Sequence, residues 1–261
     1  MCGICGIYNP RGMDSADTAA IGPMTDVLAH RGPDGSGTHA DDFAALGHRR
    51  LSIIDLSGGA QPMPNEDGSV WTAFNGEIYN FKSIREDLAA KGHTFKTNSD
   101  TEVIVHGWEE YGPEVAAKLD GMFALAVWDA PRRTLLLARD RAGKKPLYYT
   151  TAAGGRFLFS SEIKSLLLHP MVERRLNNAS LHHTLSFQHV PGEDTIFAGI
   201  KKLPPAHLMI LGEGAQPPRR YWFPHDVRSL SAPSARRAAA ELPDLIREAV
   251  RARLMSDVPL G

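Results

Sequence analysis

The residue with the clearest capacity for chemistry is Cys2, which directly follows the initiator methionine. Methionine is commonly removed before a small residue, and its removal would leave Cys2 with a free α-amine. An α-amine has a pKa of ~7.7–8.0 and a thiol a pKa of ~8.5, so one residue would supply both a nucleophile and its base. The alternative is a small buried residue without a chemical role, which position alone does not exclude.

Cys2 and Cys5 also form a lone CxxC pair. A thioredoxin-like pair would follow a strand, and a structural zinc site would need a second pair of ligands. Neither is present, and the 11 histidines show no HExxH or similar spacing. The sequence therefore predicts no metal site. Two cysteines are too few for a disulfide framework, which favours a cytoplasmic protein.

Other polar positions are ambiguous when they are taken one at a time. Asn75-Gly76 follows an apolar β-branched run, where the dipeptide is the favoured signal for a type I′ hairpin turn. Arg50 stands beside Arg49, and nothing local distinguishes a binding arginine from a solvated charge. Asp100 directly precedes an apolar periodic run, as the N-cap of a helix would.

The elements that must position these residues alternate irregularly along the chain. Apolar, β-branched runs predict strands at 5–8, 51–54, 70–74, 122–128, 134–138, 148–149 and 157–159. Helical periodicity and capping residues predict helices at 15–28, 82–91, 101–111 and 236–255. This mixture lacks the regular alternation of a doubly wound sheet, so it predicts an α+β fold.

Composition changes after about residue 190, where proline and glycine pairs mark irregular chain. We expect a complete domain over residues 2–190 and an extended segment and linker over 191–234. Residues 235–261 then hold a helix and the lead-in to a strand, which cannot bury a core of their own. They are expected to be the start of a second, truncated domain.

Bulk composition excludes several classes of protein. The 261 residues are 43% hydrophobic and 23% charged, as in globular domains and unlike disordered or fibrous chains. No apolar run approaches the ~18 residues of a membrane span. The net charge of −1 gives no bulk attraction for nucleic acid or an anionic membrane.

Short blocks occur in a fixed order along the chain and together resemble a known family. They are Met1-Cys2-Gly3-Ile4, His30-Arg31-Gly32-Pro33-Asp34, Arg50-Leu51-Ser52-Ile53-Ile54-Asp55, Asn75-Gly76-Glu77-Ile78-Tyr79-Asn80, Ser99-Asp100-Thr101-Glu102, Gly121-Met122-Phe123-Ala124, Arg139-Asp140, Pro146-Leu147-Tyr148-Tyr149 and Ser161-Glu162-Ile163-Lys164. The chain resembles the N-terminal glutaminase domain of glutamine-hydrolysing asparagine synthetases, which are class II glutamine amidotransferases. Ser256-Asp257-Val258-Pro259 extends the resemblance toward the synthetase domain. The resemblance implies an N-terminal-nucleophile fold, a four-layer αββα sandwich, and hydrolysis of glutamine to glutamate and ammonia.

The resemblance also assigns the catalytic roles. Cys2 would attack the side-chain amide of glutamine and form a thioester, which water then hydrolyses. The side chain of Asn75 and the backbone N–H of Gly76 would form the oxyanion hole.

The same resemblance implies how glutamine is bound. Arg50 would hold the α-carboxylate with its guanidinium, and Asp100 would pair with the α-ammonium. Leu51, Ile53 and Glu77 would complete the pocket, although Leu51 and Ile53 are equally compatible with ordinary strand core. The block at 30–34 is expected to shape a loop, and Arg139-Asp140 to form a structural ion pair or to face the missing domain.

The parent enzyme would use ATP, Mg²⁺, aspartate and glutamine, whereas this fragment would need no cofactor. The Ser-Gly-Gly-x-Asp-Ser loop that grips ATP pyrophosphate in these synthetases is expected just past Gly261, and no GxxxxGK[ST] loop replaces it. Expected partners are glutamine and the C-terminal synthetase domain, with a homodimer as a further possibility. The alternatives are a paralogue that amidates another carboxylate and a catalytically silent folded module.

Overall fold

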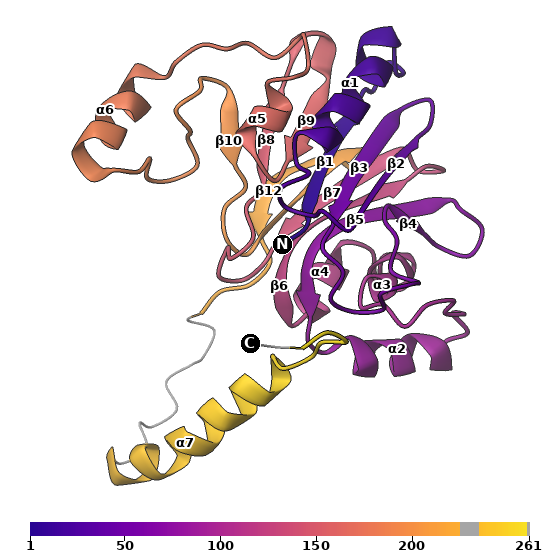
Figure 1. Cartoon of the computed structure of the whole chain (residues 1–261), viewed down its shortest axis with the longest axis vertical. Coiled ribbons are helices and arrows are strands. Elements are labelled where there is room, and N and C mark those ends of the chain that lie inside the picture. The colour runs from indigo at the N-terminus through magenta and orange to yellow at the C-terminus, as the bar shows by residue number, and fades with distance from the viewer. Residues whose placement is uncertain (225–234, 260–261) are drawn as a thin grey trace.

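The computed structural model describes residues 1–224 and 235–259, and these contain two six-stranded antiparallel sheets (Figure 1). The first sheet has, in spatial order, β10 (Ile200–Lys202), β8 (Tyr148–Thr151), β9 (Phe157–Ser160), β1 (Gly3–Tyr8), β3 (Ala44–Arg50) and β2 (Gly35–Ala40). The second has β12 (Gln216–Arg220), β11 (His207–Gly212), β7 (Thr134–Arg139), β6 (Gly121–Asp129), β5 (Val70–Ile78) and β4 (Met63–Pro64).

Helices cover the outer faces of both sheets. α1 (Ser15–Asp26) and α5 (Ile163–Leu166) pack on the first sheet. α2 (Phe81–Ala90), α3 (Glu102–Tyr111) and α4 (Val115–Lys118) form the layer on the second sheet. The predicted α+β fold and its four-layer αββα arrangement are therefore confirmed. The remaining helices are α6 (Asn178–Phe187), α7 (Ala235–Ala252) and the short η1 (Gly112–Glu114) and η2 (Ala153–Gly155).

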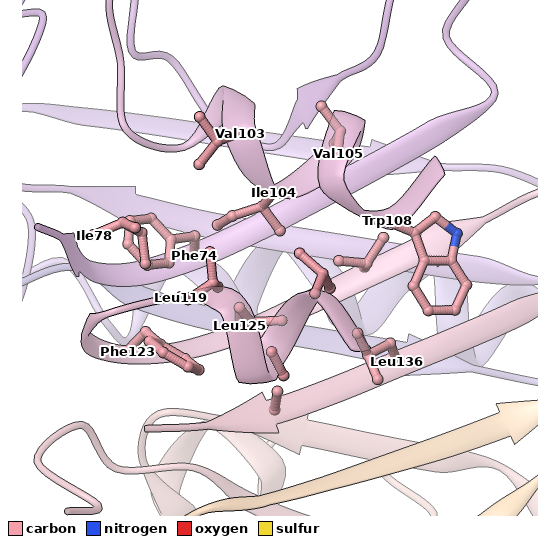
Figure 2. Packing of buried hydrophobic residues seen from close by; sticks show 14 of the residues in the cluster. Phe74, Ile78, Val103, Ile104, Val105, Trp108, Leu119, Phe123, Leu125 and Leu136 are labelled. Carbon is pink, nitrogen blue, oxygen red and sulfur yellow. The ribbon is translucent and has the colours of Figure 1, made fainter. Parts of the chain in front are cut away.

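The central strands are apolar on both faces because each face is buried in a different core. In β6, Phe123, Leu125 and Val127 pack toward the α2–α4 layer. The alternate residues Ala124, Ala126 and Trp128 face the core between the sheets. Figure 2 shows the outer cluster, in which Ile104 and Trp108 of α3 lie against the strands of the second sheet. α3 is thereby fixed to the sheet along its length.

One predicted strand is absent from the structure, and the predicted strand 70–74 is longer than expected. Residues 51–54 form no strand, because the preceding strand β3 ends at Arg50. Asn75-Gly76 is not a hairpin turn, since β5 continues through both residues to Ile78 and pairs with β6 throughout. The turn signal is overridden by this continuous pairing with a neighbouring strand.

The segment expected to be extended chain and linker contributes strands to both sheets. β10 pairs with β8, while β11 and β12 extend the second sheet. The proline and glycine pairs mark turns between these strands, and Pro217-Pro218 lie in β12 at the sheet edge, where proline is tolerated. The sheets therefore continue beyond residue 190 to residue 220. The part of the expected linker that falls at 225–234 lies outside the described residues.

α7 projects away from the sheets, and the chain after it returns toward the start of α2 (Figure 1). Met255 packs beside the core of the second sheet. The Asp257 N–H donates to the Ile53 carbonyl at 2.9 Å, and its carboxylate accepts from the Asp55 N–H at 2.7 Å. Among the described residues, no helix has the length and apolar character needed to cross a bilayer.

Candidate functional site

A cavity of about 200 Å³ lies where the N-terminus meets β5 and the start of α3, and we call it the Cys2 cavity. Every predicted site residue lines it: Cys2, Arg50, Leu51, Ile53, Asn75, Gly76, Glu77 and Asp100. Its volume is below the ~300–1,000 Å³ of drug-sized pockets, which suits a ligand the size of an amino acid. The structure thus brings residues from four separate blocks of the sequence together.

The Cys2 thiol is held by the backbone of Leu51. Its Sγ lies 3.4 Å from the Leu51 N–H and 3.6 Å from the Leu51 carbonyl oxygen. Burial raises the pKa of the Cys2 thiol. The hydrogen bond from Leu51 and the positive charge of the Met1 α-amine act in the opposite direction and lower it. A thiol with a raised pKa is a poor nucleophile unless a base takes its proton. Leu51 therefore acts through its backbone rather than as strand core.

The second cysteine of the CxxC pair has a different environment. Cys5 is fully buried in β1, and its Sγ contacts the Thr25 hydroxyl at 3.4 Å. Burial raises the pKa of the Cys5 thiol to about 11, which keeps it protonated. Both cysteines are free, and only Cys2 reaches the cavity.

Strand register places the backbone N–H of Gly76 at the open edge of β5. The N–H groups of Phe74 and Ile78 point away from β6, because the first donates to Gln61 Oε1 at 2.7 Å and the second to Asp100 Oδ2 at 2.9 Å. Gly76 lies midway between them, so its N–H faces the same side. Its partner across the strand, Phe123, confirms this register by bonding to Asp140 on the far side of β6.

Asn75 supplies a second donor in the same place. Its side chain is 1% exposed, and its Nδ2 has no hydrogen-bond partner among the described residues. A buried amide N–H without a partner costs roughly 1–3 kcal/mol, so its position demands an explanation. An oxygen that develops negative charge in the cavity would satisfy both this donor and the Gly76 N–H.

The close approach of β6 also requires a glycine at position 76. A Cβ at this position would lie 2.1 Å from the Met122 carbonyl oxygen and 2.8 Å from Phe123 Cα. Any other residue would therefore push β5 away from β6. The glycine serves the close approach of two strands, not the turn that its sequence context indicates.

Arg50 lies at the cavity and simultaneously organises the loop beyond it. Its guanidinium donates to the carbonyl oxygens of Ile54, Asp55 and Leu56 at 3.0, 2.5 and 2.9 Å. Three of its five N–H groups are thus engaged, and two remain for a ligand. Arg49 points elsewhere and pairs with Asp26. Geometry therefore separates two arginines that the sequence alone does not distinguish.

Asp100 is buried at the cavity wall and is not a helix cap. The N-cap of α3 is Thr101, while Asp100 accepts a hydrogen bond from the Ile78 N–H. Burial, reinforced by the nearby charge of Glu77, raises the pKa of Asp100 to about 7. Burial also raises the pKa of Glu77, although Lys145 opposes that shift. A cationic ligand group would favour the ionised form of Asp100.

The block at residues 30–34 shapes the loop around the site, as expected. Arg31 Nε donates to the Cys2 carbonyl at 2.9 Å, and Asp34 accepts from the Ser52 N–H at 2.8 Å. Gly32 admits the backbone of Arg49, whose carbonyl carbon a Cβ would approach to 2.4 Å. These contacts fix the backbone on both sides of the Cys2 thiol.

The expected ion pair between Arg139 and Asp140 is not formed. Arg139 donates instead to the backbone carbonyls of Gly143, Lys145 and Leu203. Asp140 accepts from the backbone N–H groups of residues 123, 142, 144 and 145. The two residues therefore shape the turn that presents Lys145.

Some lining residues were not predicted from the sequence. Lys145 is 7% exposed and faces Glu77 and Cys2 across the cavity. Gln61 bridges β5 to the Thr101 hydroxyl, which it reaches at 3.2 Å. Lys145 adjoins recognised blocks, whereas Gln61 has no local pattern that would have revealed it.

Comparisons with known proteins agree with this geometry. Residues 1–222 match the sequence profile of the glutamine amidotransferase domain. "Asparagine synthetase [glutamine-hydrolyzing] 1" of Bacillus subtilis (strain 168) is 38% identical over 263 residues, covering 100% of this chain and 41% of that protein. "Asparagine synthetase [glutamine-hydrolyzing]" of Zea mays is 36% identical over 261 residues, covering 100% and 39%. The chain thus spans about two fifths of the length of these relatives.

Solved structures resemble the fold. Glutamine phosphoribosylpyrophosphate amidotransferase from B. subtilis superposes with a TM-score of 0.60 at 18% identity, over 85% of this chain and 50% of that chain. A structure described as the allosteric regulatory enzyme of purine biosynthesis also gives a TM-score of 0.60, at 19% identity over 85% and 49%. At this level of identity the likeness concerns the fold alone.

Proposed function

Because the chain belongs to the glutamine amidotransferase family, we propose that it is the glutaminase portion of a glutamine-dependent asparagine synthetase. In this proposal it hydrolyses glutamine to glutamate and ammonia through a thioester on Cys2. The observation that carries the proposal is the buried, unpartnered amide of Asn75 in the same cavity as the Cys2 thiol. The geometry supplies an electrophilic donor where a carbonyl attacked by that thiol would develop charge.

The reaction needs a base for the Cys2 thiol. The α-amine of Cys2, freed when Met1 is removed, accepts the thiol proton as sulfur attacks the amide carbon. The oxyanion is stabilised by Asn75 Nδ2–H and the Gly76 N–H. As the C–N bond breaks, the ammonium of Cys2 returns its proton to the leaving group, which departs as ammonia. Water then cleaves the thioester and yields glutamate and the regenerated thiol.

Charged groups would orient the substrate in the cavity. The two unengaged N–H groups of Arg50 face the α-carboxylate, and ionised Asp100 pairs with the α-ammonium. The rest of the cavity lining in this proposal is Leu51, Ile53, Glu77 and Lys145. Opposite charges at the two ends select an amino acid over a simple amide.

The parent enzyme would couple this reaction to amidation of aspartate with ATP and Mg²⁺, through a C-terminal synthetase domain. Two features support such a continuation. α7 exposes the apolar side chains of Leu242, Leu245, Ile246 and Val250 on a helix that stands away from the sheets. Asp257 forms hydrogen bonds with the backbone of Ile53 and Asp55. The carbonyl oxygens of residues 54 and 55 in the same loop accept hydrogen bonds from Arg50. A cytoplasmic location and a homodimer remain part of this proposal.

The test is release of glutamate from glutamine by the purified chain and two cysteine variants. Cys2→Ala removes the nucleophile and should lower turnover by about 10³-fold or more. The matched control, Cys5→Ala, removes a buried thiol outside the cavity and should retain most of the activity. Turnover that survives in Cys2→Ala, or fails equally in both folded variants, would contradict the proposal.

A further inference from the structure

A second group of ionisable side chains lies on the flank of α3, outside the Cys2 cavity. Glu66 comes from the connection between β4 and β5, His93 follows α2, and His106 belongs to α3. One ligand atom from each lies within 4.8 Å of the other two. Glu109 of α3 adjoins them, and we call these four residues the His/Glu cluster. None of them lines the Cys2 cavity.

Hydrogen bonds orient both carboxylates of the cluster. Glu66 Oε1 accepts from the Thr94 N–H at 3.0 Å, and Glu109 Oε1 accepts from Asn65 Nδ2 at 2.7 Å. The other oxygens, Glu66 Oε2 and Glu109 Oε2, lie 3.5 and 3.3 Å from Nδ1 of His106. Each carboxylate is therefore anchored through one oxygen and presents the second to the same imidazole nitrogen, as metal-ligating carboxylates do.

The opposite nitrogen of His106 faces a further carboxylate. His106 is 1% exposed, and its Nε2 lies 3.6 Å from Glu102 Oε1 without forming a hydrogen bond. Glu102 is itself fixed by the N–H groups of Lys96 and Thr97 at 2.7 and 2.8 Å. Without a metal ion, Nδ1 of His106 makes a hydrogen bond with Glu109 Oε2 at 3.3 Å. Binding of an ion at Nδ1 would replace this bond and place the ring proton on Nε2, where it faces Glu102.

The spacing of the inner atoms matches a small cation. Zinc–nitrogen and zinc–oxygen bonds of about 2.0–2.1 Å place neighbouring ligand atoms of a tetrahedral site about 3.3 Å apart. The two Glu–His106 distances are 3.5 and 3.3 Å, and His93 Nδ1 lies 3.7 Å from Glu109 Oε2. These three distances are within a few tenths of an ångström of that edge length, whereas the ligand atoms of Glu66, His93 and His106 as a set lie within 4.8 Å of one another, and a bound ion would draw them closer.

Local charge also favours a cation. Within the described part of the chain, no lysine or arginine forms an ion pair with Glu66, Glu102 or Glu109, whereas Glu110 is paired with Lys91 at 3.1 Å. Three carboxylates therefore surround two imidazoles without another positive partner. A divalent ion would offset most of this charge, and a mixed imidazole–carboxylate donor set suits zinc and its neighbours in the first transition row.

We propose that Glu66, His93 and His106, with Glu109 as a further carboxylate, bind a divalent transition-metal ion of the zinc class. The ion joins the β4–β5 connection, the chain between α2 and α3, and α3 itself. It lies outside the chemistry of the Cys2 cavity and stabilises the helix that follows Asp100 and Thr101. The competing explanation is a metal-free network of ion pairs around a protonated His106.

The test is a titration of the chelator-stripped chain with Zn²⁺, carried out in the Cys2→Ala background so that the reactive thiol cannot contribute. We expect one zinc ion per chain and an X-ray absorption spectrum with nitrogen and oxygen ligands only. His93→Ala should weaken binding at least 100-fold, and Glu102→Gln about 10–100-fold. His182→Ala, which removes an exposed histidine of α6, is the matched control and should bind normally.

Thermal unfolding supplies a second readout. Saturating Zn²⁺ should raise the midpoint of unfolding of the native cluster and leave the midpoint of folded His93→Ala unchanged. Absence of stoichiometric zinc binding, a sulfur ligand in the spectrum, or equal affinity in His93→Ala and His182→Ala would overturn the proposal. The ion-pair network is then the correct description.

Discussion

The Cys2 cavity lies at the start of α3 and the His/Glu cluster lies along its flank, yet the two regions are organised in opposite ways. The cavity gathers a thiol, donors and charges of both signs around an open space. The cluster packs carboxylates and imidazoles directly against each other, with Glu–His contacts of 3.3 and 3.5 Å. The first arrangement leaves donors for a substrate to satisfy, whereas the second concentrates one sign of charge where an ion is needed.

Two buried histidines show the same contrast. His48 of β3 donates from Nε2 to the Phe74 carbonyl oxygen at 3.0 Å, its Nδ1 has no partner among the described residues, and burial lowers its pKa to about 4. His106 is equally buried, but its carboxylate neighbours outweigh burial and raise its pKa. Burial alone therefore does not determine the charge of a histidine in this fold, and the surrounding carboxylates decide it.

The largest effect within this comparison should come from the unpartnered donor. Asn75→Ala removes one of two oxyanion donors and should lower kcat for glutamine hydrolysis by about 10²–10³-fold, with little change in KM. Steady-state kinetics measure both constants. A rise in KM of the same size with an unchanged kcat would show that Asn75 only binds substrate. Zinc affinity, which depends on the cluster alone, should not change.

The next effect concerns stability. His48 has a pKa of 6.5 when unfolded and about 4 when folded, so the unfolded chain binds more protons between these values. Stability is therefore fully present above pH 6.5 and falls toward pH 4, by roughly 3 kcal/mol for this group. Denaturant unfolding of the wild type and of His48→Gln measures the difference.

His48→Gln should flatten that part of the pH profile, while the exposed His182→Gln should not. Identical profiles for the wild type and a folded His48→Gln would show that folding leaves the pKa of His48 unchanged. The contrast between His48 and His106 would then not be explained by the burial of His48.

A smaller effect is expected for glutamine affinity. Asp100 has a pKa of about 7, so it becomes protonated as the pH falls through that value and loses its attraction for the α-ammonium. The dissociation constant should rise by up to about tenfold per pH unit below 7. Calorimetry in the Cys2→Ala background separates this binding from chemistry. Asp100→Asn should bind weakly at every pH, and a pH-independent wild-type constant would contradict the assignment.

The residues of the two regions were not equally predictable from the sequence. The cavity residues lie in contiguous blocks, because the thiol at the chain terminus, the edge of one strand and the start of one helix each contribute neighbouring residues. The ligands of the cluster come from positions 66, 93 and 106, which share no periodicity. Packing of α3 against two connections creates that group, and no local pattern encodes it.

The fold shows the same division. β6 and β7 were predictable because both faces are buried and the runs are uniformly apolar. Residues 51–54 are equally apolar, but the carbonyls of residues 54–56 bind the guanidinium of Arg50 instead of another strand. Asn75-Gly76 carries a turn signal that long-range pairing overrides. Local chemistry predicts an element well where its partners are also local.

Glutamate release from two forms of the chain tests whether the α-amine of Cys2 is the base for its own thiol. One form begins at Cys2, as verified by intact mass, and the other retains Met1. We expect glutamine turnover from the first form and none above background from the second, because an acylated amine cannot accept the thiol proton. Equal turnover by both forms would contradict this role of the α-amine.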